Sequence, residues 1–499
     1  CGNIILMHDG GGDRSETVKA LNIIVPAILQ RGYQIVPVSD LLGKTRAEVM
    51  PPISKNERWA ALVASLSFSI VRFIGDFIIF VFFIGDVLMT GRLVFIGTLA
   101  IYDRLRGPRL KPDPTYHPEV AVLIPAYNEE KVIERTVRAV LDSDYPNLRA
   151  IVIDDGSKDE TVEVVRAAFA AEIASGLVTL LTKVNAGKAS ALNFGLEYVT
   201  EEIFVGIDAD TIIAPDAISL LVQHFINPEI AALAGNAKVG NRMNWWTRWQ
   251  ALEYITSQNF ERRALDVFGA VSVVPGAIGA WRTAAVREAG GYHHDTVAED
   301  ADLTMALLQA GYRVEYEDLA LAYTEAPASA NGLMRQRFRW SFGIMQSVWK
   351  HRSAFRKGGA LGWFALPNVV IFQILLPLVS PFIDLMFVFG AASYAWNRYM
   401  HPESTDPSSF HKLVVYFALF LVIDFIASTV AFTLERRQPG GHKDFWLLGH
   451  VWLQRFAYRQ LFSIVLLKTM KRAIDGGDFA WDKLERTASV RRPAGVPIR

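Results

Sequence analysis

The sequence predicts an α/β domain at residues 117–327 that is inserted between two membrane regions. Strand-like and helix-like segments alternate in this stretch, which is typical of an α/β fold. The whole chain is 51% hydrophobic although 20% of its residues are charged. The apolar excess lies in four stretches outside the domain, each near or above the roughly 20 residues with which a helix crosses a bilayer: Trp59–Tyr102, Leu361–Tyr394, Leu413–Phe432 and Phe445–Leu467.

Composition argues against several other classes of protein. The formal net charge is zero, so a nucleic-acid partner is not indicated. The single cysteine, Cys1, excludes an intramolecular disulfide. Buried helices of a large soluble protein are the alternative to membrane spans, but core helices rarely stay apolar over such lengths. No signal peptide is visible before the strand-like Asn3–Met7, and we expect the chain to be the cut end of a longer protein.

The chain divides into six regions. Residues 1–55 are expected to hold the strand Asn3–Met7, a Gly-rich turn, the helix Ser15–Gln30 and the strand Gln34–Pro37. The first membrane region follows, then the α/β domain, a basic amphipathic segment that fits a helix on the membrane surface, a second membrane region and a basic tail. Their bounds are 57–103, 117–327, 328–358, 361–470 and 471–499.

The charges of the connecting segments predict the orientation in the membrane. Lys and Arg are frequent just before the domain, at 104–111, and just after it, at 350–357, whereas the loop Asn397–His411 is poor in both. Cytoplasmic segments carry the excess of Lys and Arg. We therefore expect a multi-pass protein of the cell membrane, with a cytoplasmic α/β domain and an external loop at 397–411.

Four strands are expected in the first part of the domain, and two of them end in acidic residues. They are Val120–Pro125, Ala150–Ile153, Val178–Leu181 and Ile203–Ile207. The first is nearly all apolar, as a strand buried on both faces should be. Open α/β sheets bind ligands at the carboxyl ends of their strands, so polar residues that follow the strands mark the expected site.

Asp208-Ala209-Asp210 is the motif that most clearly indicates a metal site. Residues i and i+2 of an extended segment point to the same side, so both carboxylates can meet one cation. Mg²⁺ or Mn²⁺ bound there would also hold a diphosphate and neutralise its charge as it leaves. Taken alone, the pattern also fits a solvated turn after a strand.

Four further motifs have ordinary structural explanations when each is taken alone. Asp154-Asp155-Gly156 fits a turn, and Asn185–Lys188 fits a helix start, although its lysine and free amides would also suit phosphate. Glu299 and Asp300 would favour a helix N-terminus. The run Gln336–Trp340 fits a surface helix without a catalytic part.

In this order and spacing, the motifs resemble those of the processive inverting family 2 glycosyltransferases, such as cellulose, chitin, hyaluronan and poly-N-acetylglucosamine synthases. The resemblance runs from about His117 to Trp340 and continues into the flanking apolar helices. It implies a GT-A, Rossmann-like domain between transmembrane helices, a UDP-sugar donor, a polysaccharide acceptor and a divalent metal. Export through the enzyme's own membrane helices is also implied, and accessory export subunits are compatible with it.

The resemblance assigns donor-side roles to the first acidic motifs. Asp154 and Asp155 match the residues that hold uracil and ribose, with Asp155 the better ligand. Asp208 and Asp210 match the motif that binds metal and diphosphate.

The resemblance assigns the later motifs to the general base, the diphosphate and the acceptor. Glu299 and Asp300 match a threonine-glutamate-aspartate motif in which alanine replaces threonine here, and Asp300 would be the general base. Gln336, Arg339 and Trp340 match Q-x-x-R-W, whose arginine meets the diphosphate and whose tryptophan stacks on the acceptor sugar. Pro275-Gly276-Ala277 lies where the family has an acceptor-contacting loop.

The N-terminal residues carry a second resemblance, to the end of a polysaccharide deacetylase domain. It rests on Asn3–Asp9 and the three glycines that follow, and it gives His8 the role of an assisting general acid. The metal-binding residues of such domains lie earlier and are absent here, so the fragment is not expected to be active. By association, it suggests N-acetylglucosamine as the sugar. An external deacetylase would require an odd number of crossings in 57–103, whereas an apolar stretch of this length would more comfortably hold two, as a hairpin. Of the two arrangements we favour one full span plus an interfacial helix.

Two other functions remain open from the sequence. A non-processive family 2 enzyme would pass one sugar to a lipid phosphate carrier, but such enzymes usually lack Q-x-x-R-W. A catalytically silent scaffold or translocation subunit would keep the fold and lose the acidic residues. Asp210, Asp300 and Arg339 are all retained, which favours an enzyme.

Overall fold

The computed structural model describes residues 4, 5, 7, 15–52, 54–107, 113–400, 402, 407–435, 442–475 and 488–490. The chain divides into two compact units, Cys1–Phe83 and Ile84–Arg499, which are described separately.

The first unit is helical where it is described. The expected helix is present as α1, Ser15–Gln30, and the short helices α2, Val38–Leu41, and α3, Arg46–Val49, follow. The expected strands are wrong: Ile4, Ile5, Met7 and the whole of 34–37 have no regular secondary structure. A strand needs a partner for its backbone hydrogen bonds, and the described residues of this unit contain none. His8 lies outside the described residues.

A single long helix, α4, extends over Lys55–Arg106 in place of the expected span and separate interfacial helix. It begins with a capping box: the backbone N–H of Ser54 donates to Glu57, and that of Glu57 donates to the Ser54 hydroxyl at 3.3 Å.

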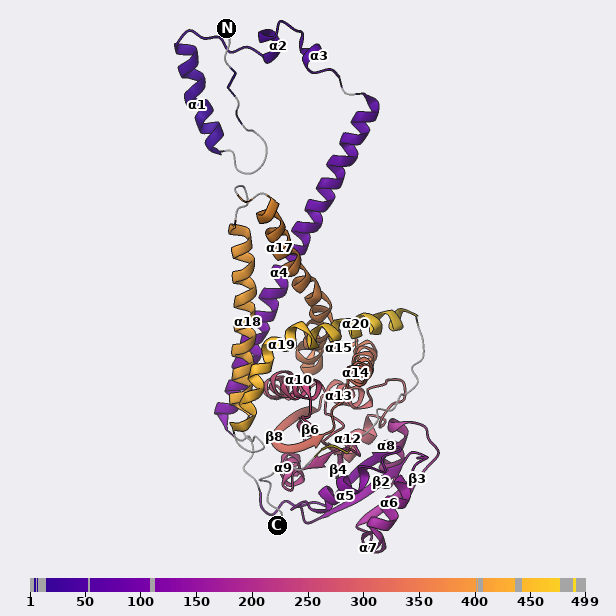
Figure 1. Ribbon diagram of the computed structural model, residues 1–499. Coiled ribbons are helices and arrows are strands. Elements are labelled where there is room, and N and C mark those ends of the chain that lie inside the picture. The colour runs from indigo at the N-terminus through magenta and orange to yellow at the C-terminus, as the bar shows by residue number, and fades with distance from the viewer. Residues whose placement is uncertain are drawn as a thin grey trace. The chain divides into compact units, whose positions relative to one another are not determined.

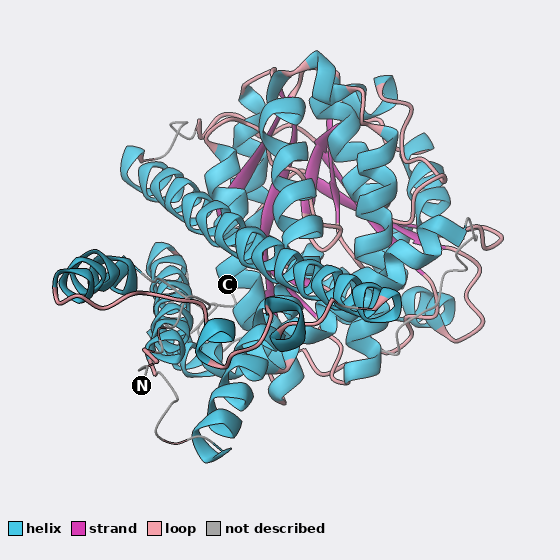
Figure 2. Cartoon of the chain, turned by 90° about the horizontal axis from the view of Figure 1, so that it is seen from above, coloured by secondary structure: helices cyan, strands magenta, loops and turns pink. Residues whose placement is uncertain are grey.

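The second unit is built on an eight-stranded mixed sheet (Figure 2) of order β3-β2-β1-β4-β7-β6-β8-β5. The first four pair in parallel, β7 runs antiparallel to both β4 and β6, β8 is parallel to β6, and β5 is antiparallel to β8. The bounds are β1 Val120–Ala126, β2 Leu148–Asp154, β3 Val178–Thr182, β4 Ile203–Gly206, β5 Ile212–Ile213, β6 Ile230–Val239, β7 Gly279–Arg282 and β8 Arg313–Thr324.

Helices cover both faces of this sheet, as Figure 2 shows. Successive residues of β1 therefore enter two different cores: Val120 and Val122 belong to one, Ala121 and Leu123 to the other. The helices around the sheet are α5 Ile133–Leu141, α6 Thr161–Ala168, α7 Ala170–Ala174, α8 Lys188–Glu197, α9 Ala217–Gln223 with the 3₁₀ turn η1 His224–Ile226, α10 Trp245–Glu253, the π-helix η2 Tyr254–Asn259, α11 Phe260–Asp266, α12 Thr283–Glu288 and α13 Glu299–Gln309. The predicted α/β domain is confirmed.

The helix α14, Ala330–Lys350, carries the predicted Q-x-x-R-W run. Its N-cap is Ser329, whose hydroxyl accepts from the N–H of Gly332 at 3.1 Å. The short α15, Ala354–Lys357, follows and leads into a helical segment with two π-helical parts: η3 Leu361–Ala365, α16 Leu366–Asn368, η4 Val369–Leu375 and α17 Leu376–Met400.

In the part of the chain that the structure describes, three helical segments are long and apolar enough to cross a membrane: Phe83–Arg106, Leu361–Met400 and Phe417–Leu434. The last belongs to α18, Ser408–Leu434, which lies beside α17 (Figure 1) through the stacked pair Phe387 and Phe417 at a centroid distance of 4.0 Å.

The fourth apolar stretch, Phe445–Leu467, does not form such a helix. It is divided among η5 His442–His450, α19 Val451–Phe456 and α20 Tyr458–Asp475. Polar residues explain the division, since Arg455 pairs with Asp384 of α17 at 2.5 Å and Arg459 with Asp424 of α18 at 2.8 Å.

Part of the expected basic tail packs on the α/β domain. Val490 is buried in one of the two cores, and Arg135 of α5 donates to the carbonyls of Ala488 and Val490 at 3.0 and 2.9 Å. The rest of the tail beyond Asp475 lies outside the described residues.

Candidate active site

One cavity of about 490 Å³ collects nearly all of the residues predicted for the site. They come from the ends of β2 and β4, the start of α8, the loop before β7, the start of α13 and the middle of α14. Those that line the cavity are Asp155, Lys188, Asp208, Asp210, Pro275, Gly276, Ala277, Glu299, Asp300, Gln336, Arg339 and Trp340.

The two aspartates after β4 both face this cavity, as their i, i+2 spacing predicts. The backbone of Asp208 is fixed by its N–H, which donates to the carbonyl of Gly276 at 2.9 Å. Asp210 is 5% exposed, and its carboxylate lies 3.4 Å from the hydroxyl of Thr324 at the end of β8. The motif is therefore held between β4, β8 and the loop before β7.

Lys188 provides a cation among these acids. It is the first residue of α8, and its Nζ lies 2.7 Å from Asp208 Oδ1 and 3.0 Å from Glu299 Oε1. Burial disfavours the charged ammonium, but the nearby carboxylates of Asp208, Glu299 and Asp300 outweigh it and hold the pKa of Lys188 well above its usual value. The cavity therefore holds a positive charge among its carboxylates.

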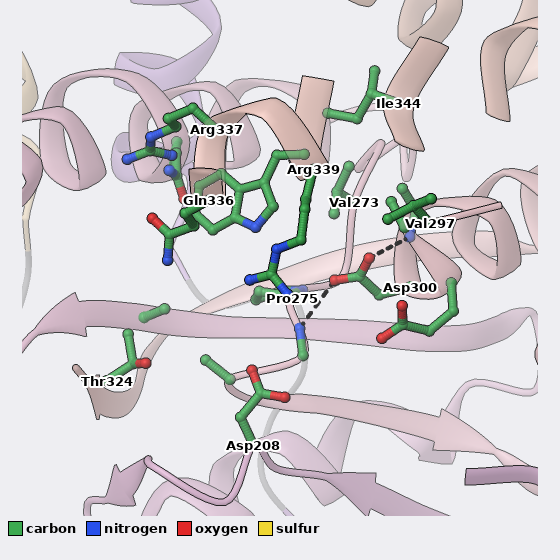
Figure 3. Close-up of a pocket in the computed structure, with 18 of the residues that line it drawn as sticks. Asp208, Val273, Pro275, Val297, Asp300, Thr324, Gln336, Arg337, Arg339 and Ile344 are labelled. Carbon is green, nitrogen blue, oxygen red and sulfur yellow. Dashed lines mark hydrogen bonds between the residues drawn. The ribbon is translucent and has the colours of Figure 1, made fainter. Parts of the chain in front are cut away.

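Asp300 lies in the first turn of α13, with its carboxylate turned into the cavity (Figure 3). One oxygen accepts from the N–H of Ala301 at 2.8 Å and the other from the N–H of Gly276 at 3.2 Å. Burial, followed by the charge of Glu299, raises the pKa of Asp300 to about 6. A carboxylate with that pKa is ionised at neutral pH and still basic enough to accept a proton.

Gly276 connects the two acidic motifs through its backbone. Its carbonyl accepts from Asp208 while its N–H donates to Asp300. A Cβ atom at this position would stand 2.5 Å from Nζ of Lys188 and 3.0 Å from Asp208 Oδ1, so any side chain would separate that ion pair. The loop predicted to contact an acceptor therefore also sets the spacing of the acids.

The two aspartates after β2 have different surroundings. The carboxylate of Asp154 accepts from the backbone N–H groups of Gly156 and Ser157 at 3.2 Å and does not line the cavity. These bonds close a turn, because a short carboxylate readily bonds the amides two and three residues on. The predicted substrate contact of Asp154 stays a prediction. Asp155 lines the cavity, accepts from the N–H of Gly187 at 2.7 Å and pairs with Lys183 at 2.7 Å.

The Q-x-x-R-W residues form the opposite wall. Arg339 extends from α14 toward the level of Pro275 and Asp300, whereas Arg337 points to another side (Figure 3). Arg337 pairs with Glu253 at 2.7 Å, and its guanidinium lies 4.2 Å from the ring centroid of Trp340. This pairing supports the position of the indole, so Arg337 acts as a positioning residue.

Comparisons with known proteins agree with this geometry. Residues 117–343 match the family described as glycosyltransferase like family 2. Poly-beta-1,6-N-acetyl-D-glucosamine synthase of Staphylococcus epidermidis is 31% identical over 235 residues, which are 46% of this chain and 56% of the synthase. The synthase of Staphylococcus aureus strain COL is 31% identical over 225 residues, 45% of this chain and 54% of that protein. The chain thus spans about half the length of these curated relatives.

A solved structure has the same fold. A mannosyltransferase of Pyrobaculum calidifontis, in complex with GDP-Man and Mn²⁺, is similar with a TM-score of 0.52 at 22% identity, covering 75% of this chain and 97% of that one. Residues 117–343 form a family 2 glycosyltransferase domain. Its mixed sheet is that of the GT-A fold, so the predicted fold is confirmed.

The glycosyltransferase domain offers oxygen ligands for a divalent metal. Asp208 and Asp210 supply carboxylates on the same cavity, and the ammonium of Lys188 already lies at hydrogen-bond distance from Asp208. Within the described ranges, no group of three or more His, Cys, Asp or Glu residues is arranged to hold a metal by itself. The residues present therefore fit a metal that is also held by a bound diphosphate, which is the usual situation for Mg²⁺.

Several residues that line the cavity carried no signal in the sequence. Glu253, Tyr254 and Arg262 line the cavity from α10, η2 and α11, where a π-helical turn interrupts two α-helices. Such turns concentrate at functional sites. The residue pattern of this segment is that of an ordinary buried helix, so only the structure brings these side chains to the site.

Proposed function

We propose that this chain transfers an N-acetylhexosamine, N-acetylglucosamine in the first instance, from a UDP-sugar to the growing end of a β-linked polysaccharide. The observation that carries the proposal is the convergence of Asp300, the Lys188–Asp208 pair and Trp340 on one cavity. It provides a base, charges suited to a diphosphate and an aromatic face for a sugar ring. The staphylococcal relatives are poly-beta-1,6-N-acetyl-D-glucosamine synthases, which supports N-acetylglucosamine, as does the deacetylase-like N-terminal sequence.

The chemical step is a direct displacement. The acceptor hydroxyl oxygen bonds to the anomeric carbon, its proton passes to the carboxylate of Asp300, and the bond from that carbon to the diphosphate breaks, with UDP leaving with the electron pair. Inversion at an α-linked donor gives a β-linkage. A divalent metal held by Asp208 and Asp210 would lower the charge of the departing diphosphate.

Coupling to export is the second part of the proposal. The cavity is lined not only by the acidic motifs but also by Phe372, Gln373 and Pro377, which belong to the candidate membrane span Leu361–Met400. A product chain that grows from Trp340 would therefore meet this helix next. The excess of Lys and Arg beside the domain supports a cytoplasmic position for it, where nucleotide sugars are made.

Release of UDP from membranes that carry the chain tests this function. UDP-N-acetylglucosamine, UDP-glucose and UDP-glucuronate are supplied in turn with Mg²⁺ or Mn²⁺, and GDP-mannose serves as a further donor. Metal-dependent turnover of UDP-N-acetylglucosamine with a polymeric product supports the proposal. Turnover of another donor keeps the mechanism and replaces the sugar, whereas no turnover by well-folded protein refutes the proposed activity.

The alternative is an enzyme of the same fold that passes one sugar to a lipid phosphate carrier. Products that carry one added sugar, with no longer species, would favour this alternative over a polymerising enzyme.

A further inference from the structure

Three consecutive charged residues at the start of α11 have different environments. Glu261 is 7% exposed and accepts from Asn368 at 2.6 Å and Gln373 at 2.7 Å. Arg263 is 2% exposed and pairs with Asp318 at 2.9 Å. Both outer residues therefore fasten α11 to its neighbours, one to the candidate membrane segment and one to the sheet.

Arg262, between them, faces the cavity without a comparable partner. Its Nε donates to the carbonyl of Val273 at 3.3 Å and its Nη1 to Asn259 Oδ1 at 3.4 Å, both longer than the usual value of about 2.9 Å. No described carboxylate forms an ion pair with it. A guanidinium has five donors, so most of its capacity is available to a ligand.

The surroundings of Arg262 link it to the segment of Asp300 and to the candidate membrane span. Val273, whose carbonyl accepts from Arg262, is followed by Val274. The N–H of Val274 donates to the hydroxyl of Thr304, and that hydroxyl donates to the carbonyl of Asp300 at 2.6 Å. On the other side, Glu261 reaches the span that contains Gln373. The diphosphate-side charges are carried by other elements, Lys188 by α8 and Asp208 by the end of β4.

We propose that Arg262 binds the acceptor sugar and holds its attacking hydroxyl against Asp300, an assignment that rests on the proposed function. The group it would meet is an uncharged oxygen of the sugar, such as the acetamido carbonyl of an N-acetylhexosamine. A guanidinium suits this task because it presents several donors in a fixed plane. Burial lowers the pKa of Arg262, with Tyr316 and Tyr254 acting in the opposite direction, so hydrogen bonds to a ligand would also offset part of its lost hydration.

Saccharide affinity tests the proposal without requiring turnover. The full chain in detergent is titrated calorimetrically with a β-1,6-linked N-acetylglucosamine trimer, and separately with UDP, as wild type and as Arg262→Gln and Arg262→Lys. Because Arg262→Gln removes charge-assisted hydrogen bonds, its affinity for the trimer should be lower than that of the wild type by roughly 10-fold to 100-fold. UDP affinity should stay unchanged, and Arg262→Lys should fall between the wild type and Arg262→Gln.

The matched control is Arg166→Gln, a change of the same kind at an exposed position of α6 away from the cavity. Unchanged trimer affinity in Arg262→Gln would overturn the assignment, as would an equal loss of UDP affinity, which would place Arg262 on the diphosphate. If Arg262→Gln does not fold, the Lys variant gives the same comparison. Donor turnover by the wild type is judged separately, so the proposed function and this assignment fail by different results.

Discussion

Gly343 of α14 lies directly against Ala298, the residue that precedes α13. A Cβ atom on Gly343 would stand 2.4 Å from Cβ of Ala298. Next to this contact, the side chain of Gln346 accepts from the N–H of Val297 at 3.0 Å. The helix that carries Q-x-x-R-W is therefore seated on the segment that carries Glu299 and Asp300.

A side chain at Gly343 should separate the two helices and reduce transfer. We expect Gly343→Val to lower kcat by about 100-fold, because a displacement of about 1 Å at a reacting group has effects of that size. UDP affinity should be retained, since the three atoms nearest to a Cβ at Gly343 all belong to Ala298, before α13. Gly449→Ala is the control, as a Cβ atom there has no neighbour within 4 Å. Equal losses in both variants would contradict the prediction.

Asp300→Asn should retain binding of the donor and abolish most of the sugar transfer. The amide has nearly the shape of the carboxylate but accepts no proton from the acceptor, so polymer formation should fall by roughly 10²-fold to 10⁴-fold. UDP-sugar binding, measured by calorimetry, should be close to that of the wild type. Normal polymer yield from this variant would remove Asp300 from the mechanism.

The pH dependence of kcat should reflect the ionisation of Asp300. Burial and Glu299 raise its pKa to about 6, and a base acts only when deprotonated. The rate should therefore rise as the pH increases through about 6 and level off above it. An initial-rate profile between pH 5 and 8 measures this limb, and a flat profile over that range would contradict the assigned base.

Lys188→Gln should shift the rise of kcat to a higher pH. The ammonium lies among Asp208, Glu299 and Asp300, and its charge favours the ionised form of Asp300. Without it, the pKa of Asp300 should rise further and the KM for the donor should increase. A limb that stays in place while only the donor KM changes would restrict Lys188 to the diphosphate.

A buried ion pair joins the sheet to the end of α18. Lys238 of β6 and Glu435 pair with both side chains 2% exposed. Glu435→Gln would leave the buried ammonium without its counter-charge and should destabilise the protein by about 3–5 kcal/mol. Replacing both, by Lys238→Met with Glu435→Leu, should restore much of this loss. Thermal unfolding in detergent measures both, and equal destabilisation by the single and the double change would contradict the explanation.

The acidic residues of the cavity could be predicted from the sequence better than the helices around them, for a physical reason. Asp155, Asp208 and Asp210 follow predicted strands, and the ends of parallel strands meet at one edge, so local pattern was enough to bring them together. Asp154 and Asp155 have the same local pattern, and only the turn geometry separates their roles.

Features that depend on contacts between distant segments could not be predicted in this way. Gly343 and Ala298 are far apart in the chain, and nothing in either segment indicates their contact. The π-helix η2, which brings Arg262 to the cavity, has the residue pattern of an ordinary helix. The division of the fourth apolar stretch into shorter helices could not be predicted, because Arg455 and Arg459 find carboxylate partners only in the folded protein.

The size of the first products distinguishes an enzyme that extends a polysaccharide from one that adds a single sugar. Purified chain in lipid nanodiscs is supplied with labelled UDP-N-acetylglucosamine, a divalent metal and an excess of short acceptor, and products are sized while most acceptor is still unused. We expect long β-linked polymer beside unreacted acceptor, and none from Asp300→Asn. A product pool in which every acceptor carries a single added sugar, or in which the sugar is attached to lipid, would contradict it.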